Sequence, residues 1–394
     1  MKKPRRFLVS KKEGGFAPPV AIYHVVTRVV DRQFVFGDEE KEHLRLLLRM
    51  YERFSGCRIL SYCLMSNHLH VLLEVPPGCQ KDETLGLSDA ELLRRLGGLY
   101  SRNHTKLVQS ELEEAHHLID GDDPEAGEFS DWKKAQNRKE GKARLQEIHA
   151  RYSYRMHSLS EFFKGMLQRF TCWFNRERGR RGTLWESRFR SVIVQDGLAA
   201  KTMAAYIDLN PVRAGMVEDP ADYRWSSYGE AVGGGRGAKK AQQGLVRALY
   251  SFGKKEVTAR SWAQGAVAKD YRRLLMAEGM EESEVPVHSD PTKKAIKVVT
   301  RKGIDRAKAE KELERLSKEK ERDLKISKLV RCRIRYFTDG AVIGSKEFVN
   351  GVFRNQRERF GPKRKDGARR PRGALRGLSG EIWSLRDLQA EELP

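Results

Sequence analysis

The chain has 394 residues, and its 76 Lys and Arg outnumber its 54 Asp and Glu, which gives a formal net charge of +22. This excess favours a polyanionic partner, because basic side chains displace the counterions that surround phosphates. The five cysteines are scattered without a CxxC pair, which argues against a zinc ribbon and a disulfide framework and fits a reducing cytoplasm. No apolar run approaches the roughly 20 residues of a membrane span, so we expect no membrane contact.

Seven elements are predicted between residues 16 and 230. Their order is strand, helix, strand, strand, helix, strand, helix, which is a split βαβ or ferredoxin-like pattern with an added C-terminal helix. We therefore expect an α+β fold, with helices on one face of an antiparallel sheet and the other face open to a ligand. The predicted elements are, in chain order, residues 20–30, 38–55, 57–64, 68–75, 158–175, 188–195 and 197–210.

The other segments are rich in charged residues. Residues 1–15 predict a basic flexible arm, and residues 80–155 predict a charged helical insertion within the domain at 16–230. The Gly-rich stretch at 231–242 is typical of a linker. Residues 243–394 predict a basic, mainly helical accessory region that adds affinity for nucleic acid.

The pair His68 and His70 lies on the third predicted strand. Positions i and i+2 of a strand face the same side, so the two imidazoles project together while Leu69 faces the other way. Two neutral imidazoles at this spacing can bind one metal ion, and Glu74 continues the same face. The alternative is a pair of surface histidines, because an HxH pattern on its own is a weak signal.

Tyr206 and Asn210 lie on the last predicted helix, just before Pro211. They are four residues apart and share one helical face, where a phenol oxygen and an amide oxygen can approach the same ion. The alternative is a core tyrosine followed by an asparagine that ends the helix before proline.

Four blocks of sequence, in this order, resemble the single-tyrosine HUH transposases, and especially the REP-associated tyrosine transposase branch of the IS200-like family. The resemblance covers roughly residues 16–230 and does not clearly extend to 232–394. The blocks are Tyr23-His24-Val25 with Thr27 and Arg28, Tyr62 to His70, Gly182 to Phe189, and Tyr206 to Gly215 followed by Asp222 to Ser227.

The resemblance implies roles for four residues. His68 and His70 match the metal-binding pair of the family, Tyr206 matches its nucleophile, and Asn210 matches a polar third metal ligand one helical turn later. The resemblance also implies a homodimer, a nucleoid-associated location and a substrate of single-stranded DNA folded into hairpins at repeated palindromes. The expected activity is DNA nicking and strand transfer through a 5′-phosphotyrosine.

The expected cofactor is Mg²⁺ or Mn²⁺. Mixed imidazole and amide ligands leave coordination positions open for phosphate oxygens and suit these ions. Tyrosine has an ordinary pKa near 10 and is a poor nucleophile at neutral pH, so a cation that polarises the phosphate is needed.

A basic loop and the segment after it are predicted to bind DNA, since arginines neutralise phosphates and aromatic rings stack on unpaired bases. For Trp185 and Phe189, an anchoring role in the core is an equal alternative. The candidate DNA-binding residues are Arg176, Arg178, Arg180, Arg181, Trp185, Arg188 and Arg190.

Two other functions remain open at this point. One is a non-catalytic DNA-binding protein, such as a domesticated transposase that acts as a repressor. The other is an RNA-binding ferredoxin-like module, which would need exposed aromatic residues on its central strands. His24 on the first strand is either a residue that lines the site or a structural histidine.

Overall fold

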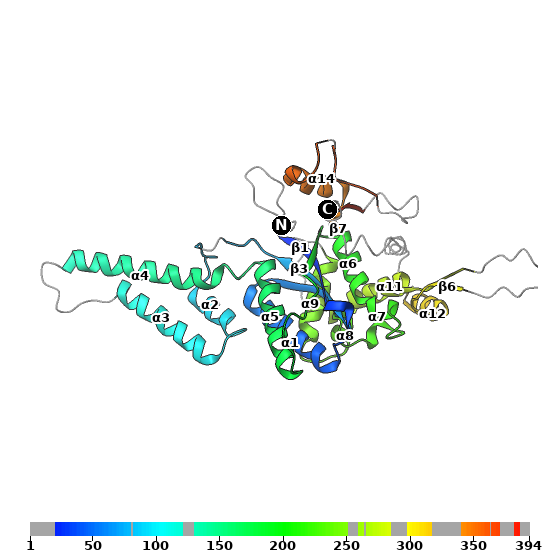
Figure 1. The fold of residues 1–394 in the computed structure, drawn as a ribbon, viewed down its shortest axis with the longest axis horizontal. Coiled ribbons are helices and arrows are strands. Elements are labelled where there is room, and N and C mark those ends of the chain that lie inside the picture. Colours follow the sequence, from blue (N-terminus) through cyan, green and yellow to red (C-terminus); the bar gives the residue numbers. More distant parts are fainter. Residues whose placement is uncertain are drawn as a thin grey trace, which may run out of the picture. The chain divides into compact units, whose positions relative to one another are not determined.

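The computed structural model describes most of the chain, in two compact units whose elements are labelled in Figure 1. Unit 1 comprises Met1–Glu42, Ile59–Glu74 and Thr183–Pro394, and unit 2 comprises His43–Arg58 and Val75–Gly182. The basic arm predicted at residues 1–15 lies outside the described residues. These are 20–79, 82–120, 130–250, 259–263, 265–284, 298–316, 340–362, 364–370 and 382–386.

Unit 1 is built on a six-stranded sheet with the strand order β2-β3-β1-β4-β7-β8. The first four strands follow the order of a ferredoxin-like sheet, in which the third strand lies between the first and the second. The predicted α+β class is confirmed. The strands are β1 (Ala21–Arg28), β2 (Arg58–Leu64), β3 (His68–Val75), β4 (Arg190–Val194), β7 (Gly340–Gly344) and β8 (Trp383–Arg386).

Two strands that the sequence did not predict extend this sheet beyond β4. Strands β1 and β4 pair antiparallel with His24 opposite Val192, whereas β4 and β7 pair parallel with Ile193 opposite Val342. Strand β8 then pairs antiparallel with β7. Both added strands come from the region that was predicted to be mainly helical, because short apolar runs do not distinguish a strand from a buried helix.

The sheet face that was expected to be open is covered, so that expectation is corrected. The six central residues of β1 are all buried, and so are seven of the eight residues of β3. Side chains of both faces are therefore enclosed. The physical reason lies in the sequence of these strands. They are nearly continuous apolar runs rather than strict alternations of apolar and polar residues, and such runs are typical of strands that are covered on both faces.

The described α-helices that lie wholly in unit 1 come from the part of the chain after β4. Helix α6 contacts β4, β7, α9 and α11, so it lies against the sheet and joins it to later helices. Residues 238–242 of the predicted linker are helical, in α9. The helices are α6 (Leu198–Asp208), α7 (Asn210–Arg213), α8 (Ser227–Val232), α9 (Ala238–Leu249), α10 (Ala259–Ala263), α11 (Ala266–Gly279), α12 (Arg306–Leu316) and α14 (Lys346–Asn355).

Shorter elements complete unit 1. A two-stranded antiparallel sheet pairs the two short strands that come between α11 and α12. The short elements are η1 (Val30–Arg32), η2 (Pro220–Asp222), η4 (Arg357–Arg359), β5 (Glu282–Glu284) and β6 (Val298–Arg301).

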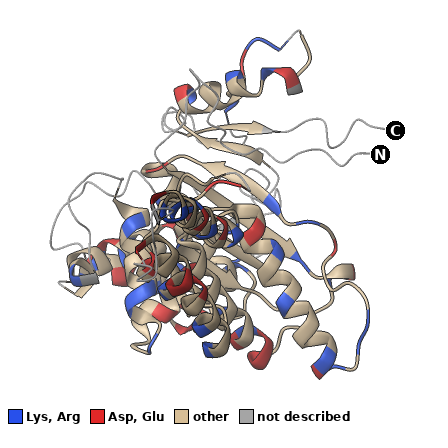
Figure 2. Ribbon diagram, turned by 90° about the vertical axis from the view of Figure 1, so that its left-hand side faces the viewer, with Lys and Arg blue, Asp and Glu red and all other residues tan. Residues whose placement is uncertain are grey.

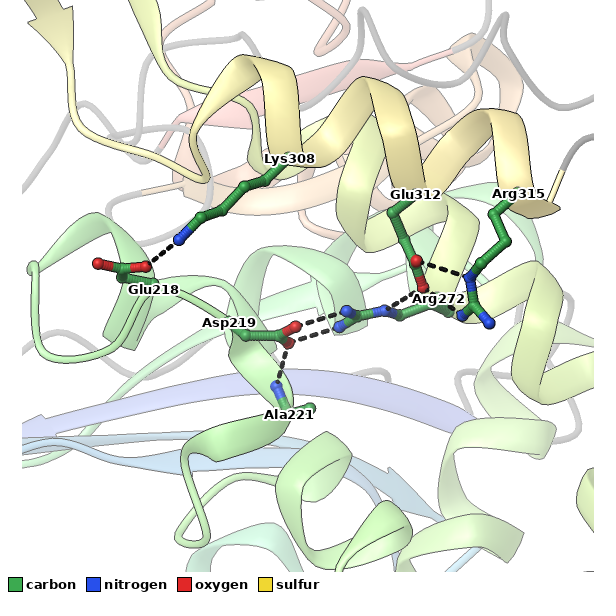
Figure 3. Close-up of polar contacts among 7 residues, drawn as sticks. All are labelled: Glu218, Asp219, Ala221, Arg272, Lys308, Glu312 and Arg315. Carbon is green, nitrogen blue, oxygen red and sulfur yellow. Dashed lines mark hydrogen bonds and ion pairs between the residues drawn. The ribbon is translucent and has the colours of Figure 1, made fainter.

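A network of ion pairs joins α11 and α12 to the segment around η2 (Figure 3). Arg272 donates to both carboxylate oxygens of Asp219, and its Nε donates to Glu312 at 3.4 Å. Burial alone would raise the pKa of Asp219, but the Arg272 hydrogen bonds outweigh burial and lower it. The region after residue 243 is thus tied to the segment before 230. The further contacts are those of Lys308 with Glu218, Arg315 with Glu312 and the backbone of Ala221 with Asp219.

Unit 2 is helical and contains most of α1 (Asp38–Ser55), which begins in unit 1. The predicted insertion forms α2 (Asp89–Leu96), α3 (Arg102–Asp120) and α4 (Ser130–Ser153), of which α3 and α4 run side by side (Figure 1). Helix α5 (Leu159–Glu177) begins with the predicted cap, since the Ser158 hydroxyl accepts from the backbone of Glu161 at 3.3 Å.

Charges of both signs are interspersed along the described helices, as Figure 2 shows in blue and red. Pairs such as Glu91 with Arg94 and Arg95 on α2 compensate one another locally. Within the described ranges, no helix combines the length and the apolar character that crossing a membrane requires.

Candidate active site

Three rings from three different elements of unit 1 meet above the sheet. His24 lies on β1 and His70 on the neighbouring strand β3, while Tyr206 projects from α6 of the same chain. The ring centroid of Tyr206 lies 5.9 Å from that of His70 and 6.0 Å from that of His24. His68 lies beside His70, with ring centroids 5.0 Å apart. The tyrosine and the histidine pair that were predicted to converge therefore lie together.

Asn67 fixes the proton of His68. The Asn67 Nδ2 group donates to the backbone oxygen of Arg32 at 2.7 Å, so its Oδ1 is the atom that faces His68. Oδ1 lies 2.6 Å from Nδ1 of His68 and can only accept, which makes Nδ1 the protonated nitrogen. Nε2 of the neutral His68 ring then carries a lone pair, as a metal ligand must.

His70 is held in the same way by a second imidazole. Its Nδ1 lies 3.0 Å from Nε2 of His24. If Nδ1 of His70 donates to His24, then Nε2 of His70 is left unprotonated, as in His68. His24 was only an open candidate from the sequence, and the structure places it against both His70 and Tyr206.

Both histidines of the pair are kept neutral by their surroundings. Burial lowers the pKa of His68 to about 4, and the nearby Arg28 guanidinium acts in the same direction. Burial also lowers the pKa of His70 well below its ordinary value, with further contributions from His68, His24 and Arg28. Neutral imidazole is the form that binds metal ions, so the pair is ready to bind a cation at neutral pH.

Tyr206 is buried, with only 2% of its surface exposed. The guanidinium carbon of Arg213 lies 5.2 Å from the centre of its ring. A cation beside the phenol favours negative charge there, as on a phenolate or an approaching phosphate. Arg213 was not singled out from the sequence, although it follows Tyr206 in the same block.

Helix α6 is anchored by the buried carboxylate of Asp208, two residues after Tyr206. Tyr271 on α11 donates to this carboxylate at 2.6 Å, and the backbone nitrogen of Tyr228 donates at 3.0 Å. Burial raises the pKa of Asp208 to about 7, although these hydrogen bonds oppose the shift. The anchor fixes the last turn of α6 and with it the position of Tyr206.

Asn210 takes the helix-ending role that was one of its two alternatives. Its Nδ2 donates to the backbone oxygens of Tyr206 and Ile207 at 3.0 and 3.2 Å, as expected of an asparagine that ends a helix. Its Oδ1 makes no hydrogen bond to any residue that the structure describes, and its side chain makes none to either histidine. The amide oxygen therefore remains an available acceptor, but the structure does not bring it into contact with the pair.

The two imidazoles are a partial donor set for a divalent cation and leave several coordination positions open. In both His68 and His70 the hydrogen bond described above is made by Nδ1, so Nε2 is the ring nitrogen that could bind a cation. No group of three or more His, Cys, Asp or Glu side chains is placed to hold a metal in the described part of the chain. Two imidazoles and one amide oxygen would leave the remaining positions to phosphate and water, which suits Mg²⁺ or Mn²⁺ better than structural zinc.

The predicted DNA-binding residues divide between the units. Arg176, which pairs with Glu177, and Arg180, which packs over Phe174, belong to unit 2 together with Arg178 and Arg181. Trp185 in unit 1 is half-buried, with its ring 5.9 Å from Phe36.

The remaining candidates of this segment have different exposures. Phe189 is buried, as the anchoring alternative expected, whereas Arg188 and Arg190 are exposed. The structure thus leaves these two arginines accessible to a ligand.

Comparison with known families bears on the N-terminal part of the chain. Residues 19–110 match the family model described as "Transposase IS200 like". This segment is therefore similar to the IS200-like transposases. The matched segment contains His24, His68 and His70 but ends before Tyr206. The position of Tyr206 beside the histidines therefore comes from the structure, and its likeness to the family comes from the sequence block at residues 206–215.

Among solved structures, the chain is similar to one described as "Structure of the REP associates tyrosine transposase bound to a REP hairpin". The sequences are 14% identical, the TM-score is 0.30, and the similarity covers 66% of this chain and 94% of that chain. A similarity this weak supports no inference about the site. No curated protein matches the sequence.

Proposed function

We propose that the chain is a metal-dependent transposase that nicks and rejoins single-stranded DNA through Tyr206. The observation that carries the proposal is the contact of the Tyr206 ring with His70 and His24. His68 lies beside this group, and its Nε2 carries the lone pair. A nucleophile next to a pair of potential metal ligands is what phosphoryl transfer to a tyrosine requires.

The reaction proceeds by substitution at phosphorus. Tyr206 Oη forms a bond to the scissile phosphorus, and the bond from phosphorus to the 3′ oxygen breaks. The phenolic proton is lost to solvent and the departing 3′ oxygen takes up a proton, which leaves a 3′-hydroxyl and a 5′-phosphotyrosine. One phosphodiester replaces another, so a second 3′-hydroxyl can reverse the step and join strands without ATP.

A divalent cation, Mg²⁺ or Mn²⁺, would neutralise charge on the scissile phosphate and polarise it toward attack. We assign its ligands as Nε2 of His68, Nε2 of His70 and Oδ1 of Asn210. Asn67 and His24 orient the two imidazoles, and Arg213 stabilises negative charge beside the phenol. Because Tyr206 is 2% exposed, neighbouring side chains must move before a phosphate reaches its oxygen.

The substrate that we propose is single-stranded DNA folded into hairpins, as the sequence blocks imply. The net charge of +22 and the exposed arginines at positions 188 and 190 support a polyanionic substrate. The homodimer expected from the resemblance is part of the same proposal.

The test is incubation of the purified protein with a panel of labelled hairpin oligonucleotides and Mn²⁺. We expect a protein–DNA species that resists denaturation and disappears with EDTA. A covalent species that forms equally well in EDTA would refute metal dependence, and its absence across hairpins and unstructured strands would refute the nicking activity.

The alternative is a non-catalytic DNA-binding protein of the same family. It predicts tight binding to hairpin DNA with no covalent species under any metal condition. The buried, neutral state of His68 and His70 beside a tyrosine favours the catalytic proposal, because a repressor has no need of this arrangement.

A further inference from the structure

A second, basic pocket lies in unit 1 at the end of β1. Its volume is about 270 Å³, enough for a phosphate group and part of the attached sugar. Strand β4 pairs with β1 as far as Arg190 opposite Val26, and the backbone nitrogen of Glu186 donates to the oxygen of Arg28 at 2.9 Å. The pocket lies where the ladder is interrupted between these two points. The lining residues are Val26, Thr27, Arg28, Arg32, Glu186, Ser187, Arg188 and Arg190.

Three of the four arginines that line this pocket have no partner among the described residues. The guanidinium groups of Arg28, Arg32 and Arg188 form no ion pair or hydrogen bond with any described residue. Glu186 is the one acidic residue that lines the pocket. Arginines that face a shared cavity without acidic partners repel one another, so the arrangement is unfavourable unless an anion binds between them.

Thr27 supplies an independent observation. Its side chain is 97% buried, since only 3% of its surface is exposed, and it lines the same pocket. Its Oγ1 has no hydrogen-bond partner among the residues described. A buried hydroxyl without a partner carries a desolvation cost, which a ligand oxygen in the pocket would relieve.

The pocket is connected to the metal-binding pair through one residue. Arg32 contributes its side chain to the pocket, while its backbone oxygen accepts the Asn67 hydrogen bond that orients His68. Asp31 and Arg32 both have positive φ, at 53° and 56°, which non-glycine residues rarely adopt. Such local strain is common where a backbone is held for ligand binding.

We propose that this pocket binds one backbone phosphate of the DNA strand, close to the scissile phosphate. The proposal deepens the function proposed above and depends on DNA being the substrate. Phe34, two residues after Arg32, is 82% exposed and is suited to stacking on a base of the same strand. The bound phosphate fixes the register of the strand before Tyr206 attacks.

The test measures DNA binding without cleavage. The protein carries Tyr206→Phe, the buffer contains EDTA, and the probe is a fluorescent strand of twelve thymidines. A triple variant, Arg28→Gln with Arg32→Gln and Arg188→Gln, is compared with a control that loses the same charge elsewhere in unit 1. The control is Arg236→Gln with Lys239→Gln and Lys240→Gln, three exposed residues at the start of α9.

We expect the pocket variant to bind the probe about tenfold or more weakly, and the control less than threefold. For the pocket variant, the slope of log Kd against log salt concentration should be smaller by about 0.7 than for the parent protein, which is the value for one lost contact to a single-strand phosphate. Equal losses in the two variants would mean that only overall charge matters, and would overturn the proposal.

Thr27→Val separates a loss of DNA binding from a loss of stability. Removing a hydroxyl without a partner should leave the Tm unchanged or raise it, while probe binding weakens several-fold. If Thr27→Val has native affinity, the hydroxyl does not contact the strand and the pocket is not a phosphate site as we describe it.

Competition with inorganic phosphate tests whether the pocket binds a phosphate of the DNA backbone or a free phosphate ion. We expect it to compete with the probe no better than sulfate of equal ionic strength, because the strand contributes more than one contact. Displacement by inorganic phosphate at low millimolar concentration would assign the pocket to free phosphate and overturn the DNA assignment. If pocket variants lose binding although the native chain never nicks DNA, the proposed function fails, while the assignment of the pocket to a DNA phosphate stands.

Discussion

The side-chain oxygen of Asn67 lies 2.6 Å from Nδ1 of His68, and the Asn67 amide nitrogen is bound to the backbone oxygen of Arg32. This chain of hydrogen bonds leaves one tautomer for the neutral His68 ring. The metal binding that we propose for His68 therefore depends on a neighbour outside the proposed ligand set.

Asn67→Ala should weaken Mn²⁺ binding by about 10- to 100-fold, the usual effect of removing a residue that orients a metal ligand. The measurement is titration calorimetry in the absence of DNA. Asn103→Ala, a change on helix α3 in unit 2, is the matched control and should bind Mn²⁺ like the native chain. An Asn67→Ala protein with native affinity and Tm would show that His68 needs no such orientation.

Tyr206→Phe should abolish the covalent protein–DNA species and leave hairpin binding within about twofold. The ring is retained, so its packing against His24 and His70 persists while the nucleophilic oxygen is lost. Denaturing gels score the covalent species and anisotropy scores binding. A covalent adduct in this variant would show that another residue is the nucleophile.

His68→Ala combined with His70→Ala should remove Mn²⁺-dependent nicking and reduce the rate by at least about 100-fold. The two Nε2 atoms are the proposed cation ligands, and one amide oxygen alone binds a divalent ion weakly. The control is His116→Ala with His117→Ala on helix α3, which removes two histidines from unit 2. Nicking that survives in the first variant and still requires Mn²⁺ would place the cation elsewhere.

Arg272→Gln should destabilise the protein by about 1–3 kcal/mol at pH 7, because it removes charged hydrogen bonds to the half-buried Asp219. The folded state lowers the pKa of Asp219, so its contribution is present above the unfolded value of about 3.8 and is lost as the pH falls below it. The difference in Tm between variant and native chain should accordingly shrink as the pH falls from about 4 through the lowered pKa of the folded state. A difference that stays constant over this range would exclude the Asp219 pair as its cause.

Gly244→Ala should destabilise the protein by several kcal/mol or prevent folding. A Cβ at this position of α9 would lie 2.3 Å from the backbone oxygen of Ile59 on β2, and a backbone atom cannot move aside cheaply. Gly235→Ala is the matched control, since a Cβ there meets no atom within 4 Å. Chemical denaturation of the two variants provides the comparison, and equal stabilities would contradict the close packing of α9 on β2.

The order of the seven elements expected between residues 16 and 230 was predictable because each carries its own periodic signal. The strands around Val25 and Val71 are runs of β-branched and aliphatic residues, and Ser158 with Glu161 marks the start of a helix. Strand β7 was missed because Ala341, Val342 and Ile343 form a signal too short to assign without the β4 edge beside them.

The site was only partly predictable for a related reason. His68 and His70 are two residues apart, so the strand period alone places them together. His24 and Arg213 reach the site through pairing of β1 with β3 and through the packing of α6, which depend on tertiary contacts that no local pattern encodes. The burial of the sheet face has the same origin, because it depends on helices distant in sequence.

The parallel pairing of β7 with β4 has a consequence for self-association. Strand β7 pairs with Ile193 and Val194 of β4, so this part of β4 cannot join its counterpart in a second molecule to make a continuous sheet. In the described sheet the outer strands are β2 and β8, and Trp225 and Ser226 already pair with part of β2. Arg369 pairs in the same way with Ser384 of β8, so both outer strands of the described sheet are partly covered by their own chain. A second molecule that continued this sheet would have to pair with the parts of β2 and β8 that these contacts leave.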